Sequence, residues 1–162
     1  LQRTRGLSDG DLARGLAAAA AIGYLITRNA TVSGAEGGCQ AEIGTASAMA
    51  AGALVSLRGG TNEQIGHAVA MALKNLMGLV CDPVAGLVEV PCVKRNVIGS
   101  VNALSAADMA LAGIISRIPP DQVINAMREV GDQMHPSLRE TGQGGLANTP
   151  AAREWCEAQE EE

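Results

Sequence analysis

Large aromatic side chains are almost absent from this 162-residue chain, which has no phenylalanine, one tyrosine and one tryptophan. Apolar residues still make up 47% of the sequence, so alanine, leucine, valine, isoleucine and methionine must fill the core. Side chains of this size pack most naturally between closely spaced helices. The sequence therefore predicts an all-α fold, with one domain over residues 1–162 formed by a compact bundle of about five to six helices and a cysteine-bearing loop.

A surplus of positive charge is also missing, since 12 basic residues are outnumbered by 17 acidic ones. With a net charge of −5 and no basic cluster, a nucleic-acid-binding surface is not expected. The longest apolar run, residues 16–26, has about half of the roughly 20 residues that a membrane helix needs. It also lacks the flanks of a signal peptide. These absences predict a cytoplasmic protein that binds neither nucleic acid nor membrane.

The four cysteines form none of the short C-x₂-C pairs that are typical of zinc ribbons and ferredoxins. Without a secretory signal, they are not expected to form a disulfide framework either. Cys39 follows the glycine-rich stretch SGAEGG, and Cys81 and Cys92 bracket a segment that contains two prolines. Their spacing alone leaves two interpretations open: a metal or cluster site, or buried thiols that act as small apolar groups.

Periodic apolar residues and capping signals predict six helices. Ser8 or Asp9 can cap the first helix, and Thr61 with Gln64 forms a capping box at the start of the third. Ser105 is expected to cap a break within the fourth helix. The helices are expected over residues 11–28, 39–57, 61–78, 92–116, 120–133 and 150–159.

Two of the cysteines, Cys39 and Cys92, are expected near helix N-termini. The positive end of a helix dipole lowers the pKa of a nearby thiol and favours a negatively charged cluster. The glycines before Cys39 leave backbone N–H groups free to bond to cluster sulfides, and the prolines stiffen the loop that carries Cys81.

Three long motifs give the chain a specific resemblance to a known family. The stretches SGAEGGCQAEIG (33–44), GLVCDPVAGLVEVPCVKRN (78–96) and LRETGQGGLANTP (138–150) resemble signature stretches of the alpha chain of iron–sulfur-dependent L-serine dehydratases. The resemblance implies an all-helical domain in which Cys39, Cys81 and Cys92 hold a 4Fe–4S cluster. It also implies a lyase of amino-acid degradation and gluconeogenesis, an L-serine ammonia-lyase that releases pyruvate and ammonia. In that family the iron without a protein thiolate acts as a Lewis acid.

The family's alpha chain has a further segment upstream, and a separate beta domain helps to form the substrate site. The chain is therefore expected to be a C-terminal fragment of a longer chain that works with a serine dehydratase beta chain or domain. As an isolated fragment it is expected to be weakly active or inactive. Assembly into a homo-oligomer is left open, and the resemblance assigns no catalytic base.

Three polar residues follow the third cysteine: Lys94, Arg95 and Asn96. If the cluster lies nearby, they can offset its charge or bind the carboxylate of L-serine, with Arg95 able to form a bidentate pair. The alternative interpretation is an ordinary solvated helix face.

Ser33, Glu36 and Gln40 flank Cys39 and are candidates to orient the cluster ligands. Cys156 lies six residues from the end of the chain. In some members of the family a cysteine near the C-terminus caps the open iron, so Cys156 is either a fourth ligand at rest or a free thiol.

A different class of function stays open beside the lyase. The chain can instead be a non-catalytic helical module with free thiols, whose apolar faces bind a partner chain. A zinc-stabilised domain is the third interpretation.

Overall fold

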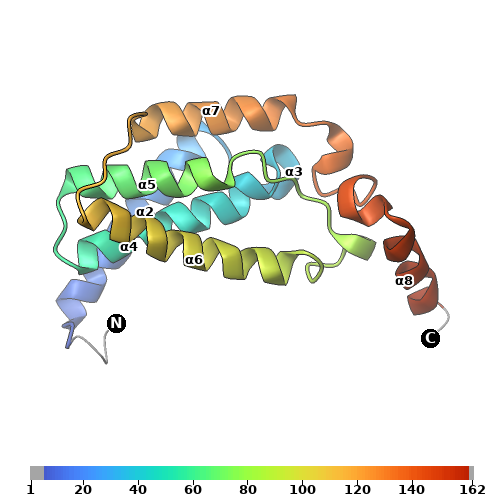
Figure 1. Cartoon of the computed structure of the whole chain (residues 1–162), viewed down its shortest axis with the longest axis horizontal. Helices are drawn as coiled ribbons and strands as arrows, with labels where there is room; N and C mark the ends of the chain where they lie inside the picture. Colours follow the sequence, from blue (N-terminus) through green and yellow to red (C-terminus); the bar gives the residue numbers. More distant parts are fainter. Residues whose placement is uncertain (1–5, 161–162) are drawn as a thin grey trace.

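The computed structural model describes residues 6–160, and the side chains of residues 6–158. Within this range the chain forms seven α-helices and no β-strand, which confirms the predicted all-α class (Figure 1). Four single turns connect the helices. The helices are α2 (Asp9–Asn29), α3 (Gly34–Gly37), α4 (Thr45–Leu57), α5 (Asn62–Leu76), α6 (Cys92–Leu111), α7 (Pro120–Gln133) and α8 (Pro150–Glu160), and the turns are η1 (Gln40–Gly44), η2 (Val84–Gly86), η3 (Pro136–Leu138) and η4 (Gly145–Asn148).

Helix α4 lies at the centre of the bundle and packs against α2, α5 and α6, while α7 covers α5 (Figure 1). Its small residues allow this close packing: Ala48 and Ala51 are completely buried, and a Cβ atom at Gly52 would lie 2.2 Å from Cδ1 of Ile22. Helix α8 stands at the end of the bundle, where it packs on η2 and η4. None of the described helices combines the length and apolar character needed to cross a membrane.

Both predicted helix caps are present. The hydroxyl of Ser8 accepts a hydrogen bond from the backbone N–H of Asp11, and Thr61 forms the expected capping box with Gln64. The predicted break at Ser105 is wrong, because α6 runs through this position without interruption. Ser105 is exposed, while buried alanines on the opposite face keep the helix packed against α4 and α5. The expected end near residue 116 is also wrong, since α6 stops at Leu111, just before a glycine with φ +86°.

Gly131 brings helix α7 against the backbone of α3. A Cβ atom at this position would lie 3.0 Å from Cα of Gly37, which is backbone and cannot rotate away. Gly66 in α5 is also helical, but its Cβ would meet nothing closer than Cγ of Pro120 at 3.7 Å. Alanine substitution at the two glycines is therefore a matched comparison. The gain in helix propensity is the same at both positions, but the steric cost differs.

We expect Gly66→Ala to stabilise the chain by up to about 1 kcal/mol, because alanine is the better helix former. Gly131→Ala should instead lower the free energy of unfolding by about 1–3 kcal/mol, since the added methyl group forces α7 away from α3. Urea denaturation of both variants measures the difference. Equal stabilisation by the two substitutions would contradict the close contact.

Candidate metal centre

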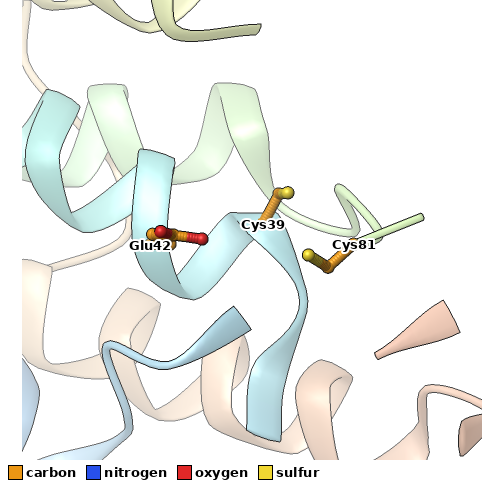
Figure 2. Close-up of side chains that lie close together, drawn as sticks. All are labelled: Cys39, Glu42 and Cys81. Atoms are coloured by element: carbon orange, nitrogen blue, oxygen red, sulfur yellow. The ribbon is translucent and has the colours of Figure 1, made fainter. Parts of the chain in front are cut away.

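Two predicted cysteines and one carboxylate meet at the end of the bundle near α8. The Sγ atoms of Cys39 and Cys81 and a carboxylate oxygen of Glu42 all lie within 4.8 Å of one another. Figure 2 shows the side chains of Glu42 and Cys81 extending toward each other, with Cys39 beside them. Cys92, the first residue of α6, is buried but belongs to no group of converging ligand atoms among the described residues. The structure therefore brings two of the three predicted cysteines, Cys39 and Cys81, together with Glu42.

Cys39 is placed by a glycine turn and a buried glutamine. Gly38 has φ +75°, and a Cβ atom there would lie 2.8 Å from the carbonyl oxygen of Leu79. The backbone N–H of Gln40 donates to that same carbonyl at 2.9 Å. The Gln40 side chain is fully buried, donating to the carbonyl of Met127 and accepting from the N–H of Gly78, both at 2.9 Å. Gln40 thus joins the Cys39 segment to α7 and to the segment that leads to Cys81.

Cys81 is held by the C-terminal motif. Its N–H donates to the carbonyl of Leu138 at 2.8 Å, and its carbonyl accepts from the N–H of Glu140 at 2.7 Å. Glu140 has φ +65°, a strained value for a residue with a side chain. A Cβ atom at Gly34 would lie 3.2 Å from Cys81 Sγ, 3.0 Å from a carboxylate oxygen of Glu42 and 3.6 Å from one of Glu140. The missing side chain at Gly34 therefore leaves space beside the thiol, bordered by two carboxylates.

A buried ion pair lies beside the thiols. The guanidinium of Arg95 donates from Nη1 to Asp82 at 2.7 Å and to the carbonyl of Val80 at 2.8 Å, and lies 3.9 Å from Cys39 Sγ. Asp82 is 3% exposed, and its second carboxylate oxygen accepts from the N–H of Leu146 at 2.7 Å. One aspartate therefore connects the cysteine loop, the first turn of α6 and the C-terminal motif.

Burial raises the pKa of all three thiols above the ordinary value of 9.0. For Cys39, hydrogen bonds from Cys81 and Arg95 offset part of the rise. For Cys81, the neighbouring Cys39 and the carboxylates of Glu140 and Glu42 add to it. The helix-dipole argument predicted a lowered pKa, and this prediction is wrong for the metal-free chain because desolvation outweighs the dipole. A metal that binds here must displace these protons.

The raised pKa values make the metal-free fold sensitive to alkaline pH. The folded chain holds the thiol protons more tightly than the unfolded chain, so this contribution to stability is complete below pH 9 and is lost as the pH rises above it. We expect the urea midpoint of the reduced, metal-free chain to fall progressively as the pH is raised above 9.0. In the double variant Cys39→Ser, Cys81→Ser the urea midpoint should decrease less steeply with pH. An equally steep decrease would show that the thiols are not the source of the pH dependence.

The residues after Cys92 differ in their surroundings. Lys94 is exposed and has no ion pair or hydrogen bond with the described residues, and Asn96 donates to the carbonyl of Cys92 at 3.0 Å. Only Arg95 turns toward the thiols, where its charge lowers the pKa of Cys39.

Two of the predicted orienting residues are not brought to the thiols. Glu36 is exposed and its carboxylate accepts a hydrogen bond from Thr31. Ser33 bonds through its backbone within the same turn. Cys156 is half-buried on α8 and belongs to no group of converging ligand atoms among the described residues.

Sequence reasoning missed Glu42, Asp82 and Glu140 as neighbours of the thiols. Glu42 follows Cys39 by three residues, the spacing that puts two side chains on one helix face, and Asp82 follows Cys81 directly. These two signals were available in the sequence. Glu42 also lies within the π-helical turn η1, a local irregularity that is frequent at functional sites.

Comparison with known proteins identifies relatives over most of the chain. The family model described as "Serine dehydratase alpha chain" matches residues 1–147. A probable L-serine dehydratase alpha chain of Bacillus subtilis is 64% identical over 141 residues, which are 87% of this chain and 47% of the relative. A probable L-serine dehydratase alpha chain of Latilactobacillus sakei is 63% identical over 137 residues, or 85% of this chain and 66% of the relative. The chain of Peptoniphilus asaccharolyticus named L-serine dehydratase, alpha chain, is 59% identical over 128 residues. This chain thus spans between 44% and 66% of the length of these three relatives.

Proposed function

Because the chain belongs to the serine dehydratase alpha chain family, we propose that it is the cluster-binding domain of an L-serine dehydratase. The observation that carries this proposal is the convergence of the buried thiols of Cys39 and Cys81 with Glu42, beside the space at Gly34. The third cysteine, Cys92, is buried at the start of α6. Residues 1–162 act in this proposal as one helical domain that carries a 4Fe–4S cluster.

The donor set fits such a cluster. Three thiolates are the ligands that iron–sulfur clusters take from proteins, and Arg95 supplies a positive charge beside Cys39. When bound, the cluster would supply an iron without a protein thiolate, a Lewis acid for the loss of the serine hydroxyl. Glu42 and Glu140 border the same space and are exposed, so their carboxylates are placed to take up the proton removed from Cα.

The substrate in this proposal is L-serine, and the products are pyruvate and ammonia. Since the Bacillus subtilis and Latilactobacillus sakei relatives are named alpha chains, we propose that this chain works with a beta chain or domain. An exposed apolar stripe on α6 supports a protein partner, because its side chains are each more than half exposed and recur on one face. The stripe consists of Val93, Val97, Val101 and Leu104.

Anaerobic reconstitution of the reduced chain with iron and sulfide tests the proposal. We expect about four iron and four sulfide atoms per chain and a brown, oxygen-sensitive protein. Addition of a serine dehydratase beta chain should then raise the formation of pyruvate from L-serine well above the level of the chain alone. A colourless protein without iron would instead favour the non-catalytic module whose apolar stripe binds a partner.

A further inference from the structure

A pocket lies next to the Cys39 segment, with Gly37 and Ala41 among its lining residues. It has a volume of about 360 Å³ and is lined by residues directly after α2, by α3 and by the last turns of α7. Ala30, Ala41 and Met127 give it an apolar wall, and none of the cysteines lines it. The cavity is therefore separate from the candidate metal centre.

Two guanidinium groups border this cavity without an acidic partner. Arg139 donates from Nη1 to the backbone carbonyl of Glu36 at a long 3.3 Å, and its Nε is buried with no hydrogen-bond partner. Arg128 is exposed, and its side chain has no ion pair or hydrogen bond with the described residues. A buried donor without an acceptor is uncommon in a folded protein and requires an explanation. Because this Nε has almost no accessible surface, a ligand carboxylate in the cavity would accept from the Nη atoms of the guanidinium, a group that binds carboxylates through parallel hydrogen bonds.

Acceptors for a positive group border the same cavity. The carboxylate of Asp132, one turn after Arg128 on α7, has no partner among the described residues. Within the described part of the chain, the carboxylate of Glu36 bonds only to the hydroxyl of Thr31. A cavity with two cationic and two anionic groups disfavours a polyanion such as a phosphorylated ligand, because each carboxylate would repel it.

We propose that this cavity binds a free α-amino acid as its zwitterion. The ligand's carboxylate lies against Arg139 and Arg128, its ammonium group lies against Asp132 and Glu36, and its side chain faces the apolar wall at Met127. The volume is more than large enough to admit a ligand of this size. The site is distinct from the one at which L-serine would react and does not depend on the proposed lyase function.

Calorimetric titration of the reduced, metal-free chain with L-alanine tests the proposal. L-alanine has no hydroxyl to eliminate, so binding is measured apart from any dehydratase chemistry. We expect saturable binding, at least tenfold weaker binding of pyruvate, which lacks the ammonium group, and similarly weak binding of ethylamine, which lacks the carboxylate. Arg128→Gln and Asp132→Asn, both at exposed positions, should each weaken L-alanine binding about tenfold.

Matched charge changes outside the cavity serve as controls. Arg117→Gln and Glu129→Gln alter exposed residues that do not line it and should leave L-alanine affinity unchanged. Equal affinity for L-alanine and pyruvate, or unchanged affinity in both cavity variants, would overturn the proposal. So would the absence of L-alanine binding up to about 50 mM, a concentration beyond ordinary weak metabolite sites.

Discussion

Replacing Cys81 with serine is expected to leave the anaerobically reconstituted chain with less than about one iron atom, against about four in the unchanged chain. Cys81 lies beside Cys39, Glu42 and Glu140, so its loss removes one of the two thiols that converge there. A serine hydroxyl stays protonated at neutral pH and is a poor substitute for a thiolate. The backbone hydrogen bonds of residue 81 do not involve the side chain, so the fold should persist.

Cys156→Ser is the matched control for this loss. It removes one thiol as well, but from α8, where the thiol meets no other ligand group among the described residues. We expect its iron and sulfide content, visible absorbance and oxygen sensitivity to equal those of the unchanged chain. Full iron content in Cys81→Ser would contradict the proposed ligand set, and loss of iron in Cys156→Ser would show that the tail delivers a fourth ligand.

The helices were predictable where their signals are local. Ser8 and Thr61 bond to the backbone three residues ahead, so a sequence window of a few residues contains the whole interaction. The end of α6 was not predictable in this way. Apolar residues continue past Leu111 to the exposed Ile114 and Ile115, and only the glycine at 113, with its positive φ, marks the stop.

The thiol neighbourhood shows the same division between local and tertiary information. The motifs pointed to Cys39, Cys81 and Cys92, but proximity in sequence misplaced Glu36, whose turn directs the carboxylate to Thr31. The contact between Asp82 and Leu146 joins residues 64 positions apart, and no local pattern predicts it. The direction of the thiol pKa shift depends on burial by the whole fold, whereas the dipole argument considered one helix end.

Removal of the ion pair between Asp82 and Arg95 is expected to cause the second large effect, a loss of fold stability. Asp82→Ala should lower the free energy of unfolding by about 3–5 kcal/mol, because it leaves a mostly buried guanidinium without its counter-charge. It also frees the backbone N–H of Leu146. Asp108→Ala is the control, since the pair of Asp108 with Arg58 is solvent-accessible and should contribute less than about 1 kcal/mol.

The order in which the C-terminal segment and the helical core unfold distinguishes a role of Asp82 in holding that segment from a general loss of packing. Trp155, the only tryptophan of the chain, lines a groove with Leu146 and Val84, so its fluorescence reports whether the C-terminal segment is docked. In Asp82→Ala we expect the fluorescence to change at a lower urea concentration than the helical circular dichroism. The C-terminal segment loses its hydrogen bond to Asp82, whereas the core around α4 stays packed. Coincident transitions at the midpoint of the unchanged chain would show that Asp82 does not hold the tail.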